Sequence, residues 1–307
     1  MNVYEKSKSF PSFKIVLSII ICHNKNISIS FIALEDFSLC YEIKNERSVS
    51  MGIYVLTGGT TGIGAEVRKK LLEAGHEVFN IDYNDGDYTA DLSTKDGRQG
   101  ALDAIYKKYP DGIDGIICNA GIGPTAPAQK IFSLNYFSVI ELAEGVRPLL
   151  KKKGGNCVVT SSNSITNQTV RMDWVDMLTN VSDEERVMEF AADIPMQQGP
   201  SSYSSSKHAI SRWIRRVSPS WAADGLRINA VAPGNTSTAM TRGMTEAQMK
   251  AALLIPIPTR YGRKEFLDAD EIANGIVFLS SKLASGINGV ILFVDGGIDA
   301  LLRSERF

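Results

Sequence analysis

The sequence is poor in the residues that build metal sites and disulfide frameworks. Four cysteines and three histidines occur among 307 residues. The cysteines, Cys22, Cys40, Cys118 and Cys157, form no CxxC pair and no cluster with histidine, which argues against a zinc site and against a disulfide framework. Cys118 and Cys157 lie inside apolar runs, as buried free thiols do. This usage fits a protein of the reducing cytoplasm.

An excess of charge of one sign is also lacking, as is a long hydrophobic run. There are 33 Lys and Arg against 34 Asp and Glu, with no basic stripe, so we expect no nucleic-acid partner. The apolar run from Lys14 to Cys22 is shorter than the roughly 20 residues that span a bilayer. No small-x-small cleavage site follows it. We therefore expect neither a membrane partner nor a signal peptide.

The first fifty residues differ from the rest, because the glycine-punctuated pattern begins only at Met51. We interpret residues 1–50 as an N-terminal extension outside the catalytic fold, and Met51 as a candidate for the true start. The alternative is a genuine strand pair packed on the domain. Mass spectrometry of the native N-terminus distinguishes them, since a peptide from residues 2–50 rules out a start at Met51.

From Met51 onward, short apolar runs alternate with segments of helical spacing, without a linker or an internal repeat. This predicts one α/β domain over residues 51–307, a Rossmann-type doubly wound parallel sheet with helices on both faces. Ligands of such sheets bind at the carboxyl ends of the strands. Glycine or polar residues follow five of the apolar runs, namely Gly58, Asp82, Asn119, Ser161/Ser162 and Pro233/Gly234.

The stretch TGGTTGIG, Thr57 to Gly64, follows an apolar run and opens a helical pattern. Its glycines let the backbone turn and approach a pyrophosphate at the helix N-terminus. Asp82 ends the next apolar run, where a carboxylate accepts hydrogen bonds from ribose hydroxyls and repels a 2′-phosphate. Its neighbours Tyr83 and Asn84 are not basic. The pattern favours NAD over NADP; the alternative for Asp82 is a solvated loop carboxylate.

Tyr203 and Lys207 are one helical turn apart in PSSYSSSKHA. A lysine charge stabilises a phenolate, which can exchange a proton with an alcohol. We expect this charge and the positive charge of a bound nicotinamide together to move the phenol pKa from about 10 toward the operating range. A serine hydroxyl should hold the reacting oxygen. Ser161 and Ser162 are the candidates, and they face opposite sides of a strand. A Tyr and a Lys at this spacing also occur by chance.

In their order along Met51–Phe307, these motifs resemble the short-chain dehydrogenase/reductase family. The resemblance rests on T-G-x-x-x-G-x-G at Thr57–Gly64, Asp91–Leu92, N-A-G at Asn119–Gly121, Asn135, Ser162, Tyr203-x-x-x-Lys207, Pro233–Gly234 and Asp295–Gly297. It implies that Tyr203 is the acid/base, that Ser162 donates to the substrate oxygen, that Lys207 binds the nicotinamide ribose and that Asn135 holds a relay water. The implied cofactor-binding residues are Gly58, Thr61, Gly62, Ile63, Gly64, Asp82, Asp91, Leu92, Asn119, Ala120, Gly121, Tyr203, Lys207, Pro233, Gly234, Thr236 and Thr238, without a metal.

Within the family, the chain resembles the bacterial 3α-hydroxysteroid dehydrogenase/carbonyl reductase subgroup. The long segment between Ser162 and Tyr203, the ADLST at Ala90–Thr94 and the ending VDGGIDALLRSERF carry this resemblance. It implies NAD-dependent oxidation of a steroid or bile acid alcohol by a homodimer. The alternatives are an aromatic or aliphatic alcohol dehydrogenase or general carbonyl reductase with the same residues, and a non-catalytic NAD-binding regulator.

Two segments are expected to build the substrate pocket. The first is a lid-like insertion at about 163–200, whose apolar faces carry Trp174, Met177, Leu178, Val187, Met188 and Phe190. The second runs from Thr236 to about Gly262 and carries Met240, Met244 and Met249. Methionines suit an adaptable apolar pocket. The alternative is that these stripes pack on the core or on a partner subunit. The histidines, including His208, are not expected to be catalytic.

Overall fold

The computed structural model describes two compact units, Met1–Ser50 and Met51–Phe307. The residues it describes are 16–22, 26–32, 51–243, 245–253, 257–258 and 266–306. In the first unit, β1 (Val16–Cys22) pairs antiparallel with β2 (Asn26–Ile32). That residues 1–50 lie outside the catalytic fold, or precede the true start, stays a prediction.

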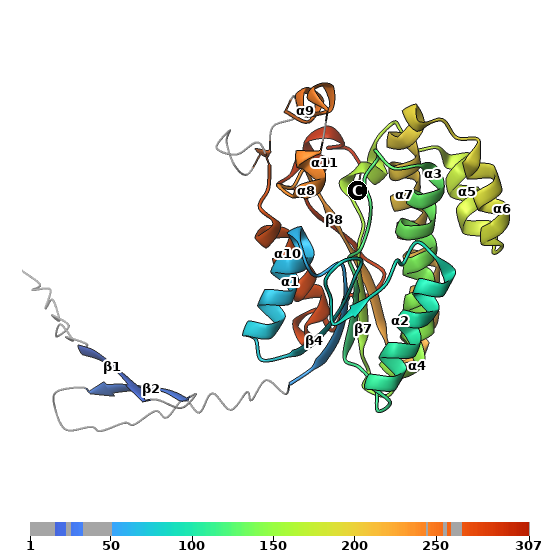
Figure 1. The fold of residues 1–307 in the computed structure, drawn as a ribbon. Coiled ribbons are helices and arrows are strands. Elements are labelled where there is room, and N and C mark those ends of the chain that lie inside the picture. The colour runs from blue at the N-terminus through green and yellow to red at the C-terminus, as the bar shows by residue number, and fades with distance from the viewer. Residues whose placement is uncertain are drawn as a thin grey trace, which may run out of the picture. The chain divides into compact units, whose positions relative to one another are not determined.

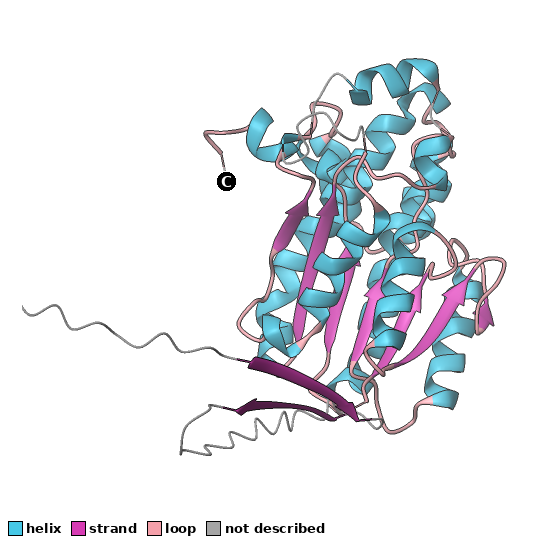
Figure 2. Cartoon of the chain, turned by 90° about the vertical axis from the view of Figure 1, so that its left-hand side faces the viewer, coloured by secondary structure: helices cyan, strands magenta, loops and turns pink. Residues whose placement is uncertain are grey.

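The second unit is built on a seven-stranded, fully parallel sheet with the order β5-β4-β3-β6-β7-β8-β9. Figure 2 shows these strands side by side beneath the helices. The strands are β3 (Ile53–Thr57), β4 (Glu77–Asp82), β5 (Tyr88–Thr89), β6 (Gly115–Cys118), β7 (Asn156–Thr160), β8 (Arg227–Pro233) and β9 (Ile291–Val294). The predicted doubly wound parallel sheet is confirmed.

Helices cover both faces of this sheet (Figure 1). One face carries α1 (Gly62–Glu73) and α10 (Ala269–Ser280), and the other carries α2 (Lys95–Lys108), α4 (Ser138–Lys151) and α7 (Gly199–Ala223). The remaining elements are α3 (Ala128–Phe132), the π-helix η1 (Ser133–Phe137), η2 (Asn163–Thr166), α5 (Met172–Asn180), α6 (Glu184–Ala192), η3 (Met196–Gln198), α8 (Ala239–Arg242), α9 (Glu246–Leu253), η5 (Lys282–Ala284) and α11 (Ile298–Leu302).

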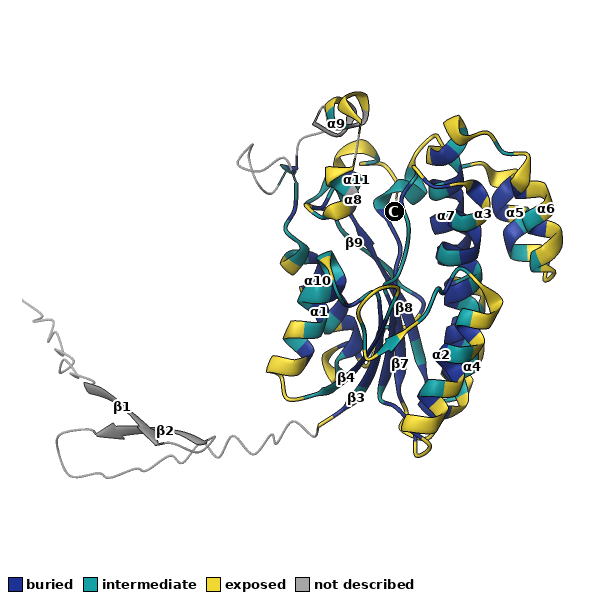
Figure 3. Ribbon diagram, in the orientation of Figure 1, coloured by how far each residue is buried: buried dark blue, intermediate teal, exposed yellow. Residues whose placement is uncertain are grey.

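The strands are apolar runs because both faces of the sheet are buried. Along β6, Ile116 and Cys118 join the core cluster under α2, α4 and α7, whereas Ile117 joins the cluster under α1 and α10. Alternate side chains of a strand point to opposite faces, so a strand covered twice needs apolar residues at every position. Figure 3 shows the central strands of the sheet mostly dark blue and the helices buried on their inner sides.

The strand order places a topological switch point between β3 and β6. From β3 the chain builds outward to β4 and β5, and it then crosses back to add β6 on the other side of β3. The loops that leave β3 and β6 therefore run in opposite directions, and sheets of this kind bind ligands at that point. The glycine turn at Gly58 and the N-A-G at Asn119–Gly121 follow these two strands.

The insertion packs against the domain rather than standing apart from it. Helix α5 lies against α7 and α6 lies against α3, on the outer side of those helices in Figure 1. Trp174, Leu178 and Val187 are buried in the core cluster, whereas 43% of Phe190 is exposed. For the three buried residues, packing on the core is the correct alternative, and they do not line a substrate pocket.

The second predicted pocket segment is described in part. Met249 is half-buried on α9, Met244 falls outside the described residues, and the side chain of Met240 is not described. None of the helices in the described part of the chain combines the length and apolar character needed to cross a bilayer.

Candidate active site

The glycine turn brings the backbone of three segments into direct contact. Gly58 has a φ of +71°, and a Cβ there would lie 2.9 Å from the Cα of Ala120. A Cβ on Gly64 would lie 1.9 Å from the Gly58 carbonyl oxygen. Thr61 is the N-cap of α1, but its side chain makes no capping hydrogen bond. The turn therefore needs glycine, and the N-terminus of α1 is not capped by its own side chain.

Asn119 ties this turn to the neighbouring strands. Its Nδ2 donates to the Gly58 carbonyl at 3.0 Å, and its Oδ1 accepts from the Thr160 hydroxyl at 3.0 Å. Thr57 Oγ1 accepts from the backbone N–H groups of Asn119 and Ala120, at 3.1 and 3.0 Å. Thr57 and Thr160 were missed as site residues, although their signal was present: each is a polar residue that ends an apolar strand.

Asp82 lies at the end of β4 and faces the same turn. Its Oδ2 accepts from the Thr60 N–H at 3.0 Å and its Oδ1 from the Tyr83 N–H at 2.7 Å. Asn80, two residues earlier, is fully buried, and its Oδ1 accepts from the Gly59 N–H at 2.8 Å. Asn80 is a second residue that sequence reasoning missed; its signal is a lone amide inside the apolar run EVFNID. Together the two side chains fix the outer half of the turn.

Asp91 and Leu92 form a tight turn that leads into α2. Asp91 Oδ1 accepts from both the N–H and the hydroxyl of Ser93, at 2.9 and 2.6 Å. Burial acts to raise the pKa of the Asp91 carboxyl, but the Ser93 hydrogen bonds and the charge of Lys130 bring that pKa below its ordinary value. Leu92 is buried in the core. The turn thus presents a fixed, ionised carboxylate beside the sheet edge.

Ser161 and Ser162 point to different partners, as alternation along a strand requires. The Ser161 hydroxyl bonds to the Ser211 hydroxyl at 2.7 Å, inside the core of the domain. The Ser162 hydroxyl instead bonds to Tyr203 and accepts from the Ser164 N–H at 3.2 Å. Ser162 is therefore the serine beside the tyrosine hydroxyl.

Tyr203 and Lys207 project from α7 toward this serine and the end of β7. Burial raises the pKa of Tyr203 above its ordinary value, and the Ser162 hydrogen bond offsets this only in part. Lys207 Nζ donates to the Thr160 carbonyl at 2.7 Å, and burial lowers the pKa of Lys207 to about 8. In the protein without a nicotinamide, desolvation therefore keeps the phenol pKa high, and the lowering expected from Lys207 and a bound nicotinamide together stays a prediction.

Asn135 lies on the π-helix η1, a rare local widening of a helix that is frequent at functional sites. It is fully buried; its Oδ1 accepts from the Ile122 N–H at 2.9 Å, and its Nδ2 donates to the Ile122 carbonyl at 3.0 Å. A Cβ on Gly121 would lie 3.1 Å from Asn135 Oδ1 and 3.4 Å from Lys207 Nζ. Gly121 thus separates the amide from the ammonium group.

The segment after β8 lies beside the glycine turn. Thr236 is buried, and its hydroxyl donates to the Gly234 carbonyl at 2.8 Å. Thr238 is the N-cap of α8, and a Cβ on Gly62 would lie 3.3 Å from the Thr238 Cγ2. The predicted cofactor residues after Pro233 are therefore brought next to the glycine turn.

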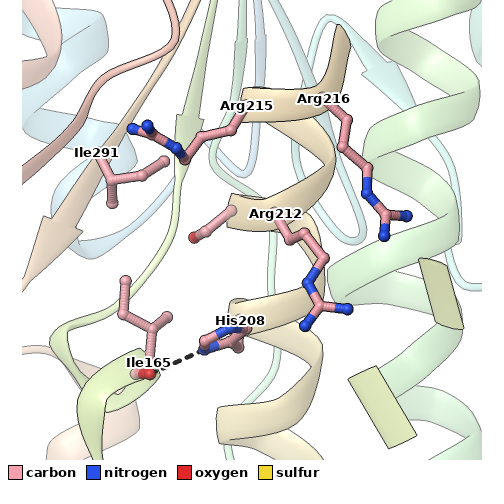
Figure 4. A pocket seen from close by; sticks show the side chains of 7 residues that line it. Ile165, His208, Arg212, Arg215, Arg216 and Ile291 are labelled. Carbon is pink, nitrogen blue, oxygen red and sulfur yellow. Dashed lines mark hydrogen bonds between the residues drawn. The ribbon is translucent and has the colours of Figure 1, made fainter. Parts of the chain in front are cut away.

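A separate pocket of about 420 Å³ lies along α7, lined by Ile165, His208, Ser211, Arg212, Arg215, Arg216 and Ile291. Figure 4 shows His208 turned toward Ile165, and its Nδ1 lies 2.9 Å from the Ile165 carbonyl oxygen. None of these residues belongs to the predicted site. His208 therefore contacts η2, the segment after Ser162, and its predicted lack of a catalytic role stays a prediction. Across the described residues, no group of acidic, cysteine and histidine side chains could hold a metal ion.

Family comparisons agree with this geometry. A model of the family "short chain dehydrogenase" matches residues 53–173, and a model described as "Enoyl-(Acyl carrier protein) reductase" matches residues 187–299.

Individual relatives cover nearly the whole second unit. The 3-alpha-hydroxysteroid dehydrogenase/carbonyl reductase of Comamonas testosteroni is 34% identical over 260 residues, spanning 84% of this chain and 100% of that protein. The 3alpha-hydroxysteroid dehydrogenase of Mediterraneibacter gnavus is 28% identical, over 80% of this chain and 95% of its own.

A solved structure shows the same arrangement of elements. The 3-alpha-hydroxysteroid dehydrogenase from Pseudomonas sp. B-0831, solved with NADH, superposes with a TM-score of 0.72 at 33% identity, covering 83% of this chain and 100% of that one. With the glycine turn, the Asn119 bridge and the Ser162–Tyr203–Lys207 arrangement in place, the chain belongs to the short-chain dehydrogenase/reductase family, whose members are oxidoreductases acting on CH–OH groups with a nicotinamide cofactor.

Proposed function

We propose that the protein is an NAD(H)-dependent 3α-hydroxysteroid dehydrogenase, which oxidises a secondary alcohol of a steroid or bile acid reversibly to the ketone. The observation that carries the proposal is the gathering of Ser162, Tyr203 and Lys207 at the carboxyl end of β7, where Lys207 Nζ donates to the Thr160 carbonyl and Ser162 acts on the Tyr203 phenol. The named activities of the relatives from Comamonas testosteroni and Mediterraneibacter gnavus support the substrate class.

The residues present fit a dinucleotide. Gly58 and Gly64 leave no room for a side chain at the turn, and the first N–H groups of α1 lack a side-chain cap from Thr61. Backbone N–H groups at a helix N-terminus bind phosphate. Gly58, Thr61, Gly62, Ile63 and Gly64 would hold the pyrophosphate. Asp91, Leu92, Asn119, Ala120 and Gly121 would line the adenosine half and the crevice, and Pro233, Gly234, Thr236 and Thr238 the nicotinamide half.

The preference for NAD over NADP rests on Asp82. Two backbone N–H groups fix its carboxylate at the turn, where it would accept from the ribose hydroxyls and repel a 2′-phosphate. Lys130, a nearby cation, lies over the Tyr83 ring, with Nζ 5.6 Å from the ring centroid, and it also lowers the pKa of Asp91.

In the proposed reaction, Tyr203 accepts the hydroxyl proton of the alcohol as the carbinol C–H bond breaks. A bound nicotinamide supplies the hydride acceptor and a positive charge. That charge favours the phenolate form of Tyr203, which the buried protein alone disfavours. The Ser162 hydroxyl donates to the substrate oxygen, where negative charge develops. Lys207 would hold the nicotinamide ribose, and Asn135 would position a water that relays the proton to solvent. Reduction of the ketone is the reverse, with Tyr203 as acid.

We also propose that the protein is a cytoplasmic homodimer. Cys118 and Cys157 are buried free thiols, which supports a reducing compartment. Helix α5 of the insertion packs on α7. That part of the α7 surface is therefore covered by the same chain and is not available to a partner subunit.

The test is NADH production with a panel of 3α-, 3β-, 7α- and 12α-hydroxysteroids beside coniferyl-type and aliphatic alcohols, each run with NAD and with NADP. We expect turnover of 3α-hydroxysteroids with NAD and much weaker turnover with NADP. Tyr203→Phe should reduce turnover about a thousandfold, within the usual range for loss of an acid/base, while NADH binding persists. Failure of every 3α-hydroxysteroid excludes the substrate assignment, and efficient turnover of aromatic alcohols supports the general carbonyl reductase. Full activity of Tyr203→Phe contradicts the mechanism.

A further inference from the structure

A buried arginine joins the insertion to the cofactor half of the domain. Arg98 lies on α2 and is fully buried. Its Nε donates to Glu141 on α4, and its Nη2 donates to Glu184 Oε2 at 2.5 Å. Glu184 is the first residue of α6, and its side chain is 12% exposed. A buried charge is costly unless it is paired and hydrogen-bonded, so this geometry holds α2, α4 and α6 together.

The same guanidinium reaches the turn that is proposed to line the adenosine subsite. Arg98 Nη1 lies 3.5 Å from the Leu92 carbonyl oxygen. That turn is rigid, because Asp91 accepts two hydrogen bonds from Ser93, and Thr94 caps α2 by accepting from the Gly97 N–H at 3.0 Å. A shift of this turn therefore moves the N-terminal end of α2, which carries Arg98.

Glu184 continues the connection toward the catalytic residues. Its Oε1 accepts from the Ser133 hydroxyl at 2.9 Å. Ser133 begins η1, the π-helix that carries Asn135 two positions later. A continuous set of hydrogen bonds thus runs from the Leu92 carbonyl through Arg98 and Glu184 to the element that holds Asn135.

A second ion pair between the same two helices provides a contrast. Lys95 Nζ lies 2.9 Å from Glu185 Oε1, but the two side chains are 57% and 79% exposed. Exposed pairs contribute little, typically about 0–1 kcal/mol, because water screens them. The buried Arg98–Glu184 contact therefore determines how α6 sits on α2.

We propose that Arg98 and Glu184 are positioning residues that couple occupation of the adenosine subsite to the ordering of α6 and η1. Binding at the Asp91–Leu92 turn restrains α2, and the Arg98–Glu184 contact passes this restraint to the insertion that separates Ser162 from Tyr203. By reciprocity, a substrate that orders the insertion binds the cofactor-loaded protein more tightly. The proposal rests on the proposed function, since it requires a bound dinucleotide.

Amide hydrogen exchange of the whole protein, with and without saturating NADH, tests the proposal. In the wild type we expect NADH to slow exchange in peptides covering Glu184–Ala192 and Ser133–Phe137 by about tenfold, the size of an ordinary coupling between two sites. Glu184→Gln should abolish this NADH-dependent protection and raise the KM for the alcohol more than it lowers kcat. Glu185→Gln, the same change one position later, should leave the NADH-dependent protection and the kinetic constants for the alcohol unchanged.

The outcomes separate this proposal from the proposed function. If NADH does not bind, the cofactor assignment itself fails. If NADH binds and turnover occurs, but NADH does not change amide exchange in α6 of the wild type, then the proposed coupling between the adenosine subsite and α6 is wrong. The results for the variants would not alter that conclusion. Equal loss of protection in Glu184→Gln and Glu185→Gln would also overturn the proposal, because the buried Arg98–Glu184 contact would then matter no more than the exposed Lys95–Glu185 pair.

Discussion

At the scale of single residues, burial of Lys207 dominates the electrostatics of the candidate site. The side chain is 4% exposed and donates to the Thr160 carbonyl at 2.7 Å. Desolvation lowers its pKa from 10.5 to about 8. Between these two values the unfolded chain binds a proton that the folded protein does not, so the free energy of unfolding rises as pH increases from 8 toward 10.5.

Lys207→Met should remove this rise. The free energy of unfolding of the wild type minus that of the variant should increase between pH 7 and pH 10, by up to about 2 kcal/mol given 1.36 kcal/mol per pKa unit. The lost bond to the Thr160 carbonyl destabilises the variant, but about equally at each pH, since a neutral amine also donates. Urea unfolding of both proteins at pH 7, 8.5 and 10, without cofactor, measures the difference. A difference that stays flat with pH contradicts the buried, depressed lysine.

Which residues meet at the site could be predicted from the motif order, but how they interact could not. Ser162 was separable from Ser161 by strand alternation, because period-two geometry is local. The partners Thr57, Thr160 and Asn80 come from three strands whose register is set by the whole sheet. The raised pKa of Tyr203 was missed because desolvation depends on what surrounds the ring, and spacing along a helix does not report that.

At the scale of elements, the insertion is part of the domain core. Trp174 of α5 is 5% exposed and makes edge contacts with Phe132 and Phe190, with ring centroids 6.2 Å apart in each case. The Arg171 guanidinium lies 4.9 Å from the centre of the same ring. Helical periodicity predicted the apolar stripe on α5, but a stripe is compatible with a core, a pocket or a subunit interface, and only the packing distinguishes them.

Trp174→Ala should therefore destabilise the whole domain. We expect a loss of about 3–5 kcal/mol, the usual cost of deleting a buried large aromatic side chain, in one cooperative transition measured by urea unfolding. Phe190→Ala is the matched control; 43% of Phe190 is exposed, so the loss should be clearly smaller. Were the insertion an independent lid, Trp174→Ala would leave global stability unchanged and raise exchange only in the insertion.

At the scale of the whole molecule, the surfaces that the chain covers with its own helices are not available to a second subunit, which narrows where a dimer contact can form. The insertion occupies the outer sides of α3 and α7. β9 is an edge strand of the sheet, and its four residues are all half-buried. Phe278 on α10 and Leu283 on η5 are 38% and 76% exposed. An unpaired edge strand with apolar neighbours favours pairing with another chain.

We therefore expect a dimer, of about twice the 33.5 kDa chain mass, by light scattering. Phe278→Glu should shift the species toward monomer, because it places a charge inside an interface that contains α10. Phe190→Glu places the same charge on an exposed aromatic of the insertion and should leave the dimer intact. A tetramer would contradict the homodimer. Dissociation by Phe190→Glu and not by Phe278→Glu would place the subunit contact on the insertion, and Phe190 would then be buried by a partner rather than exposed to solvent.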